Sequence, residues 1–152
     1  MVTGKKDINR KGVKVLLKIR DNKTEIVSPG SLVKLFRKIL RSEHITDRDK
    51  EHCWIVGLTT RNTVKYIEMV SLGTLGASLV NPREVFRLAI MQAVANIIMV
   101  HNHPSGHPEP SEEDVSITHR IAEAGKIIGI EVLDHIIIGS RMYKSFRENG
   151  LM

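Results

Sequence analysis

The sequence has few of the residues that would place it outside the ordinary globular proteins. Its 152 residues contain one cysteine, Cys53, so no internal disulfide can form, which fits a reducing compartment. No apolar run approaches the roughly 20 residues that a membrane-spanning helix needs. Residues 1–11 lack the apolar segment of a signal peptide. We therefore expect a cytoplasmic protein without membrane contact.

Aromatic residues are also scarce, and the charge is unevenly spread. Aromatics make up 4% of the chain, which argues against a platform on which nucleic-acid bases stack. The net charge is +6, but residues 1–50 alone carry +8 and residues 51–152 carry −2. The basic N-terminal third could contact nucleic acid or another polyanion. A solvated basic face with a disordered tail explains such an excess more often.

The chain does contain alternating helical and extended patterns. Its apolar content of 41% and charged content of 26% are ordinary for one soluble domain with a core. We expect residues 1–27 to form a basic lead-in with a strand or hairpin, and residues 28–152 to form the domain. Helices are predicted over 29–42, from 82, and from 111 towards 125, and strands over 51–58, 64–71, up to 103, the later part of 127–138, and 142–145, with 45–50 as a charged loop. These patterns predict a single α/β domain whose mixed β-sheet is flanked by helices.

Polar residues with metal-binding chemistry gather in one stretch, residues 101–114. His101 and His103 follow an apolar run, and residues at i and i+2 of a strand point the same way. Asp114 falls in the first turn of the next helix, where Ser111 is also a suitable N-cap. Two histidines and one carboxylate leave one position open, which is typical of a catalytic zinc site.

The spacing His-x-His, seven residues, Ser, two residues, Asp resembles the motif of the JAMM (MPN-plus) metalloproteases. The string His-Asn-His-Pro-Ser-Gly, with Pro110, Ser111 and Asp114 after it, is similar to the RadC-like branch of that superfamily. The resemblance extends over about 28–152. It implies a JAMM/MPN fold of the cytidine-deaminase-like type and a Zn²⁺ ion held by His101, His103 and Asp114. Full-length RadC-like proteins usually carry a further N-terminal region, which we expect 152 residues to be too few to include.

The resemblance also implies a catalytic glutamate at the start of the strand after the first helix. Glu51 stands there, about fifty residues before the histidine pair. It would accept a proton from the zinc-activated water, while Ser111 would polarise the carbonyl or hold the oxyanion. Without the resemblance, a glutamate at a strand start is usually a surface residue. Glu43 and Glu68 are the weaker alternatives.

Other histidines and the cysteine have less specific explanations. His135 lies in an apolar strand and could orient a ligand imidazole, although a core histidine with satisfied hydrogen bonds is the commoner case. His107 lies in the loop between the predicted ligands and is expected to be solvated. Cys53 is expected to be a packing residue.

Three functions remain open from the sequence. The first is a zinc-dependent hydrolase, a metallopeptidase or isopeptidase acting on a peptide or protein. The second is a nucleic-acid-binding or DNA-repair-associated protein with a metal site, suggested by the basic N-terminal third. The third is an inactive scaffold, which the complete set of metal-binding residues argues against. The sequence does not predict the substrate or the oligomeric state.

Overall fold

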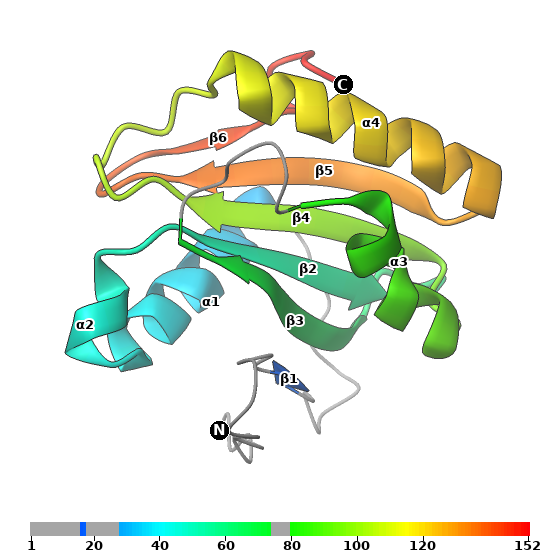
Figure 1. The fold of residues 1–152 in the computed structure, drawn as a ribbon, viewed down its shortest axis with the longest axis horizontal. Coiled ribbons are helices and arrows are strands. Elements are labelled where there is room, and N and C mark those ends of the chain that lie inside the picture. Colours follow the sequence, from blue (N-terminus) through cyan, green and yellow to red (C-terminus); the bar gives the residue numbers. More distant parts are fainter. Residues whose placement is uncertain (1–15, 18–27, 74–79) are drawn as a thin grey trace.

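One β-sheet lies between two layers of helices (Figure 1). The structure is a computed structural model that describes the backbone of residues 16–17 and all of residues 28–73 and 80–152. Its strands are β1 (Leu16–Leu17), β2 (His52–Leu58), β3 (Val64–Leu72), β4 (Asn96–Asn102), β5 (Glu131–Ile138) and β6 (Tyr143–Ser145). Its helices are α1 (Pro29–Ser42), α2 (Ile45–Arg48), α3 (Pro82–Met91) and α4 (Glu112–Ile128). The predicted α/β domain with a mixed sheet and flanking helices is confirmed.

The strand order is β1-β3-β2-β4-β5-β6. Strands β4 and β5 are parallel, and the other neighbouring pairs of described strands are antiparallel. The parallel pair is joined by α4, because a parallel connection needs a crossover. Helix α4 therefore begins near the carboxyl end of β4, and this brings the end of the strand and the start of the helix together.

The sheet is buried on both faces, and this explains the nearly continuous apolar runs in its central strands. All seven residues of β2 are buried. On one face, α1 contributes Phe36 to a cluster that includes Trp54 and Val100. On the other face, α3 contributes Phe86 and α4 contributes Ile121 to a second cluster. Strands β2 and β4 are thus held rigidly between two packed layers.

One helix was missed by the sequence patterns, and the end of another was left open. The stretch expected as a charged loop contains the four-residue helix α2, which is capped by His44 and is too short to show helical periodicity. Helix α4 does not end at Gly125 but runs to Ile128. Gly129 follows it in the left-handed conformation, with φ of 80°. Gly125 instead allows close packing, because a Cβ there would lie 2.5 Å from the carbonyl oxygen of Ile130.

The N-terminal predictions mostly lie outside the described residues. Of the strand or hairpin expected within residues 1–27, only β1 is described, and it pairs antiparallel with β3. The sequence also predicts a bend between Gly73 and Gly76, and most of it lies in residues that are not described. Within the described ranges, no helix is both long enough and apolar enough to cross a membrane.

Candidate metal centre

Strand β4 and the residue after it carry the histidine pair. His101 is the sixth of seven residues in β4, where it pairs with Cys53 of β2 and Ile137 of β5. His103 follows the strand, and its backbone N–H donates to the carbonyl of Ile138 at 3.0 Å. This bond extends the β4–β5 pairing by one step, so both histidines point to the same side. His101 is fully buried and His103 is half-buried.

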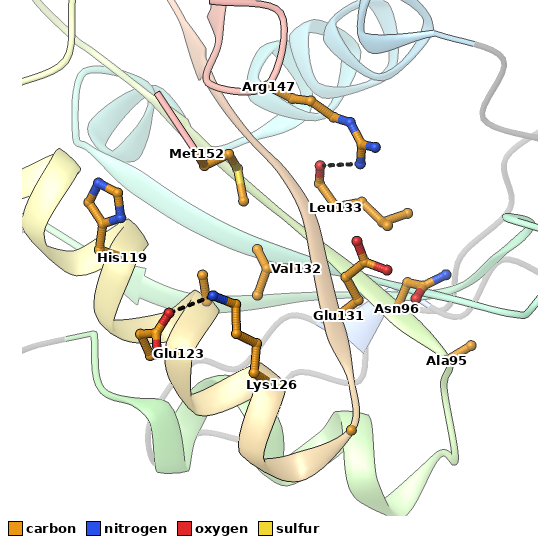
Figure 2. Close-up of a pocket in the computed structure, with 13 residues that line it drawn as sticks. Ala95, Asn96, His119, Glu123, Lys126, Glu131, Val132, Leu133, Arg147 and Met152 are labelled. Carbon is orange, nitrogen blue, oxygen red and sulfur yellow. Dashed lines mark hydrogen bonds and ion pairs between the residues drawn. The ribbon is translucent and has the colours of Figure 1, made fainter. Parts of the chain in front are cut away.

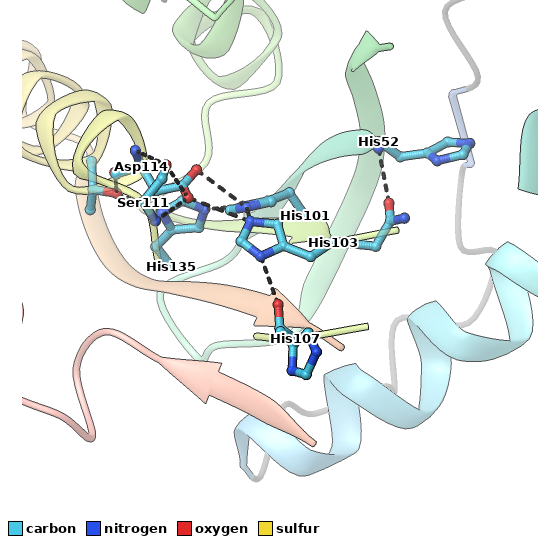
Figure 3. Close-up of polar contacts among 9 residues, drawn as sticks. His52, His101, His103, His107, Ser111, Asp114 and His135 are labelled. Carbon is cyan, nitrogen blue, oxygen red and sulfur yellow. Dashed lines mark hydrogen bonds and ion pairs between the residues drawn. The ribbon is translucent and has the colours of Figure 1, made fainter. Parts of the chain in front are cut away.

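The donor atoms of the three predicted ligands meet at this point, as Figure 3 shows. The Nε2 atoms of His101 and His103 are 2.9 Å apart. Oδ1 of Asp114 lies 3.3 Å from Nε2 of His101, and Oδ2 of Asp114 lies 3.4 Å from Nε2 of His103. The loop between β4 and α4 thus brings Asp114 back to the two histidines.

The N-terminus of α4 positions Asp114. Ser111 is the N-cap, and its hydroxyl oxygen accepts the backbone N–H of Asp114 at 3.1 Å. In return, Oδ2 of Asp114 accepts the backbone N–H of Ser111 at 2.8 Å and its hydroxyl at 2.7 Å. The capping box seen in the sequence and the approach of Asp114 to the histidines therefore occur together.

Glu51, directly before β2, lies beside His101, His103 and Asp114. We call these four residues the cluster. One carboxylate oxygen of Glu51 and one ring nitrogen each of His101 and His103 lie within 4.8 Å of one another. The group could hold a metal ion, or the carboxylate could reach a ligand in the space beside the histidines. Glu43 and Glu68, the alternatives, are not among these grouped residues. Glu68 is buried on β3, where Arg87 donates to it at 3.0 Å.

Asn102 holds the backbone on both sides of Glu51. Its side-chain oxygen accepts the N–H of His52 at 2.9 Å, and its side-chain nitrogen donates to the carbonyl of Lys50 at 3.1 Å. Asn102 faces away from the histidine pair, as its position between them requires. The central residue of the His-Asn-His string therefore fixes the segment that carries Glu51, a role that sequence reasoning missed.

Burial and charge shift the pKa values in opposite directions within the cluster. Burial, together with the neighbouring His135, holds the pKa of His101 well below its usual value. A hydrogen bond with Asp114 raises the pKa of His103. Burial acts to raise the pKa of Asp114, but the bond to His103, the nearby His101 and the bonds from Ser111 outweigh it and lower the pKa. Burial raises the pKa of Glu51.

The hydrogen bonds outside the cluster show that its donor set fits a cation. His103 donates its Nδ1–H to the carbonyl of His107 at 2.8 Å, which leaves Nε2 with its lone pair towards the cluster. Nε2 of His103 thus faces the Asp114 carboxylate and Nε2 of His101, and groups rich in lone pairs repel unless a positive charge lies between them. A proton on His103 or a metal ion would supply this charge. Imidazole nitrogen and carboxylate oxygen are suitable ligands for a divalent transition metal.

A second layer of contacts lies behind His101. Its Nδ1 atom is 2.7 Å from Nε2 of His135 on β5, and Nδ1 of His135 is 2.5 Å from the hydroxyl oxygen of Thr118 on α4. His135 is therefore both a core histidine and a neighbour of a predicted ligand. Sequence reasoning missed Thr118, although it stands four residues after Asp114, on the same face of the helix.

His107 and Cys53 are placed as expected. The His107 ring is exposed, and the residue contributes its backbone carbonyl to the site. Cys53 is buried in the core on the α3–α4 side of the sheet, and burial raises the pKa of its thiol to about 12. Such a thiol is protonated near neutral pH and is a poor nucleophile.

A separate cavity of about 800 Å³ lies beside the later turns of α4 (Figure 2). It is lined by Asn96, Lys126, Glu131 and Arg147, among others, and by none of the residues of the cluster. Because α4 returns antiparallel to β4, this cavity lies at the opposite end of the helix from Asp114.

Comparison with known proteins relates the chain to one family. Residues 26–151 match the family described as RadC-like JAB domain. The chain is 51% identical over 110 residues to a UPF0758 protein of Desulforamulus reducens, covering 72% of this chain and 48% of that protein. It is 47% identical over 141 residues to a UPF0758 protein of Alkaliphilus metalliredigens, covering 93% and 59%. A UPF0758 protein of Methanosarcina mazei is 42% identical over 134 residues, covering 88% and 56%. The chain spans about half the length of these relatives.

Proposed function

Because this chain belongs to the RadC-like JAB domain family, we propose that it is a zinc-dependent hydrolase of peptide or isopeptide bonds. The observation that carries the proposal is the convergence of His101, His103 and Asp114 beside Glu51. Two imidazoles and one carboxylate would hold zinc and leave a fourth position open for water or substrate, as in catalytic zinc sites. A bound zinc ion would lower the pKa of a bound water to about 7 and polarise a substrate carbonyl.

Glu51 would act as the general base in this mechanism. Its carboxylate lies close enough to the histidine nitrogens to reach a water molecule placed between them. It would take the proton from the attacking water and then pass it to the leaving amine. Asn102 would support this transfer, because its two hydrogen bonds fix the backbone on either side of Glu51.

Ser111 would have two roles that alternate. Its hydroxyl hydrogen is directed at Oδ2 of Asp114, which orients the carboxylate towards the histidines. To stabilise an oxyanion, the hydroxyl must turn from that oxygen to the substrate. A metal held by the Asp114 carboxylate would weaken the hold of that carboxylate on the hydroxyl and favour this turn.

Nucleic-acid binding is the second candidate function. It is favoured by the net charge of +8 on residues 1–50, and it would add a contact surface without changing the chemistry of the cluster. The cytoplasmic location and the identity of the metal stay predictions.

Metal analysis with matched variants tests the proposed hydrolase. Purified protein reconstituted with zinc should retain about one ion per chain, and His101→Ala or Asp114→Ala should lose most of it. Glu109→Gln, which changes an exposed glutamate in the same loop, should retain the ion. The loaded protein is then screened against peptide, isopeptide and DNA substrates, with a chelated sample beside it. Failure to retain any metal would disprove the proposal, and cleavage of DNA alone would favour the second candidate.

A further inference from the structure

A buried line of hydrogen bonds runs from His101 back to Asp114 through two residues that do not face the cluster. Nδ1 of His101 contacts Nε2 of His135 at 2.7 Å, and Nδ1 of His135 contacts the Thr118 hydroxyl oxygen at 2.5 Å. That hydroxyl lies 2.5 Å from the backbone carbonyl oxygen of Asp114. All four residues are buried, and they come from β4, β5 and α4. Figure 3 shows His135 against His101, on the side away from His103.

The direction of these bonds follows from the single hydrogen on the Thr118 hydroxyl. A carbonyl oxygen has no hydrogen, so the short contact between the two oxygens requires Thr118 to donate to Asp114. With its hydrogen used there, the Thr118 oxygen can only accept from His135. Nδ1 of His135 therefore carries a proton.

His135 can then have no second proton. It is 1% exposed, and its ring nitrogens face the Thr118 hydroxyl and the His101 ring, so neither meets a carboxylate. A buried imidazolium without a counter-charge is unfavourable, and His135 is neutral with a bare Nε2. Since Nε2 of His135 must accept, the hydrogen of the bond belongs to Nδ1 of His101.

We propose that Thr118 and His135 are positioning residues that fix the proton of His101 on Nδ1 and so direct the lone pair of Nε2 into the cluster. This inference rests on the proposed metal site and adds a determinant of its affinity. Without the line of bonds, the neutral imidazole of His101 could place its proton on either nitrogen, and a proton on Nε2 would have to leave before a metal could bind.

The surroundings hold the His135 ring in the required orientation. Its backbone N–H donates to Oδ1 of Asp134 at 2.8 Å, and Oδ2 of Asp134 accepts the Ser145 hydroxyl at 2.7 Å. The ring of Phe146 stacks on the His135 ring with centroids 4.7 Å apart. The Asp-His pair of the β5 sequence is thus explained. Asp134 fixes the backbone of His135, and the His135 ring contacts Nδ1 of His101.

The test uses two pairs of variants and two measurements. Thr118→Val removes the hydroxyl with little change of shape, and Thr118→Ser retains it. His135→Phe removes the acceptor, and His135→Gln offers an amide oxygen to His101 and an amide N–H to Thr118. Binding of Co²⁺ alone and of Zn²⁺ alone is titrated, and nitrogen-15 NMR of the metal-free protein reports which ring nitrogen of each histidine carries hydrogen.

We expect the metal-free parent to show His101 protonated on Nδ1. Thr118→Val and His135→Phe should weaken metal binding by about 10- to 100-fold, the usual effect of losing a partner behind a ligand. Thr118→Ser and His135→Gln should stay close to the parent. Thr59→Val, which removes a hydroxyl from the β2–β3 turn, is the control for loss of a partly buried side-chain hydrogen bond elsewhere.

Protonation of His101 on Nε2 in the parent would overturn the inference, and so would parental affinity in both Thr118→Val and His135→Phe. If one variant does not fold, the other pair and the NMR of the parent still decide. The outcome is separate from hydrolysis: a protein that binds metal in this graded way but cleaves nothing would refute the proposed activity and leave the inference standing.

Discussion

At the scale of single residues, the proposed chemistry depends most on Glu51, the proposed general base, whose carboxylate lies beside the histidine pair. Glu51→Gln retains the shape and hydrogen-bonding capacity of the side chain but cannot accept a proton. We expect zinc content and unfolding temperature close to the parent, and turnover lower by about 10² to 10⁴. Glu109→Gln, which changes an exposed glutamate outside the cluster, is the matched control. Cleavage at the parental rate by Glu51→Gln would show that another group is the base, and Glu43 and Glu68 would be tested next.

A second prediction at this scale concerns pH. Burial lowers the pKa of His135 to about 4, against an ordinary value of 6.5. The unfolded chain therefore binds a proton that the folded chain rejects in this interval, and the stability contributed at higher pH is lost as the pH falls from 6.5 to about 4. The gap corresponds to roughly 3 kcal/mol.

Chemical denaturation of the metal-free protein across this interval measures the effect. The free energy of unfolding should fall with pH, and His135→Gln, which has no titrating group, should show a shallower fall. His103, whose pKa is raised by Asp114, works in the opposite direction and makes the observed slope smaller. An unchanged slope in His135→Gln would contradict the assignment.

The residues that face the cluster could be predicted from the sequence, whereas those behind it could not. His101 and His103 share a face because they are two residues apart at a strand end, and the resemblance to the JAMM motif predicts that Asp114 and Glu51 meet them. Thr118 and Asn102 are common residue types whose roles depend on what the fold places opposite them. Asn102 meets Lys50 and His52 only because β4 pairs with β2 in one register.

At the scale of elements, the first turn of α4 contributes both to the stability of the fold and to the proposed chemistry. Ser111→Ala removes the acceptor of the Asp114 N–H and the donor to its carboxylate. The loss of the cap should cost about 1 kcal/mol, and turnover should fall by about 10²-fold if the hydroxyl also serves the oxyanion. Zinc should be retained.

Asn81→Ala is the matched control for this prediction. Asn81 caps α3 by accepting the N–H of Glu84 at 3.1 Å, far along the chain from the cluster. It should lose similar stability and no turnover. If Ser111→Ala loses stability but retains full activity, Ser111 is a cap and nothing more.

Gly125 sets how closely α4 can approach the turn that leads into β5. An added Cβ would lie 2.5 Å from the backbone oxygen of Ile130 and 3.2 Å from the ring of Phe86. Because the backbone cannot easily move away, Gly125→Ala should destabilise the protein by about 1 to 3 kcal/mol in thermal or chemical unfolding. Gly30→Ala on α1, where the nearest atom is 3.8 Å away, should be neutral or slightly stabilising. Equal stability of the two variants would argue against this packing.

The missed helix α2 and the open end of α4 show the same limit of sequence patterns. Periodicity reports which residues of an element face the core, but not how closely two elements approach. The sequence indicated α4 only as far as about Gly125, and it did not show that this glycine lies inside the helix and allows a contact between elements. Helix α2 was missed because four residues give no period to detect. The sheet and the longer helices were predictable, since their apolar patterns extend over several turns or alternations.

At the scale of the whole molecule, charge separates the two candidate functions. If residues 1–50 bind DNA, affinity should fall steeply with salt, because each neutralised phosphate releases counterions. We expect weak binding without sequence preference. Changing Lys5 and Lys6 together to Gln should reduce the salt slope by about two, and Lys126→Gln on α4 should leave it unchanged. Tight, sequence-specific binding at physiological salt would make nucleic-acid recognition the primary function.

The position of the cluster also determines how parts of the protein open in time. Strand β4 has paired strands on both sides, so the backbone around His101 opens to solvent only when the sheet comes apart. The amide of Asp114 is held by one serine side chain at a helix end, where fraying is fast. An ion held by both residues would close the proline-containing loop between them into a ring. The first turn of α4 would then open only as often as the centre of the sheet, so metal binding would appear as slow exchange at a place that is otherwise among the first to open.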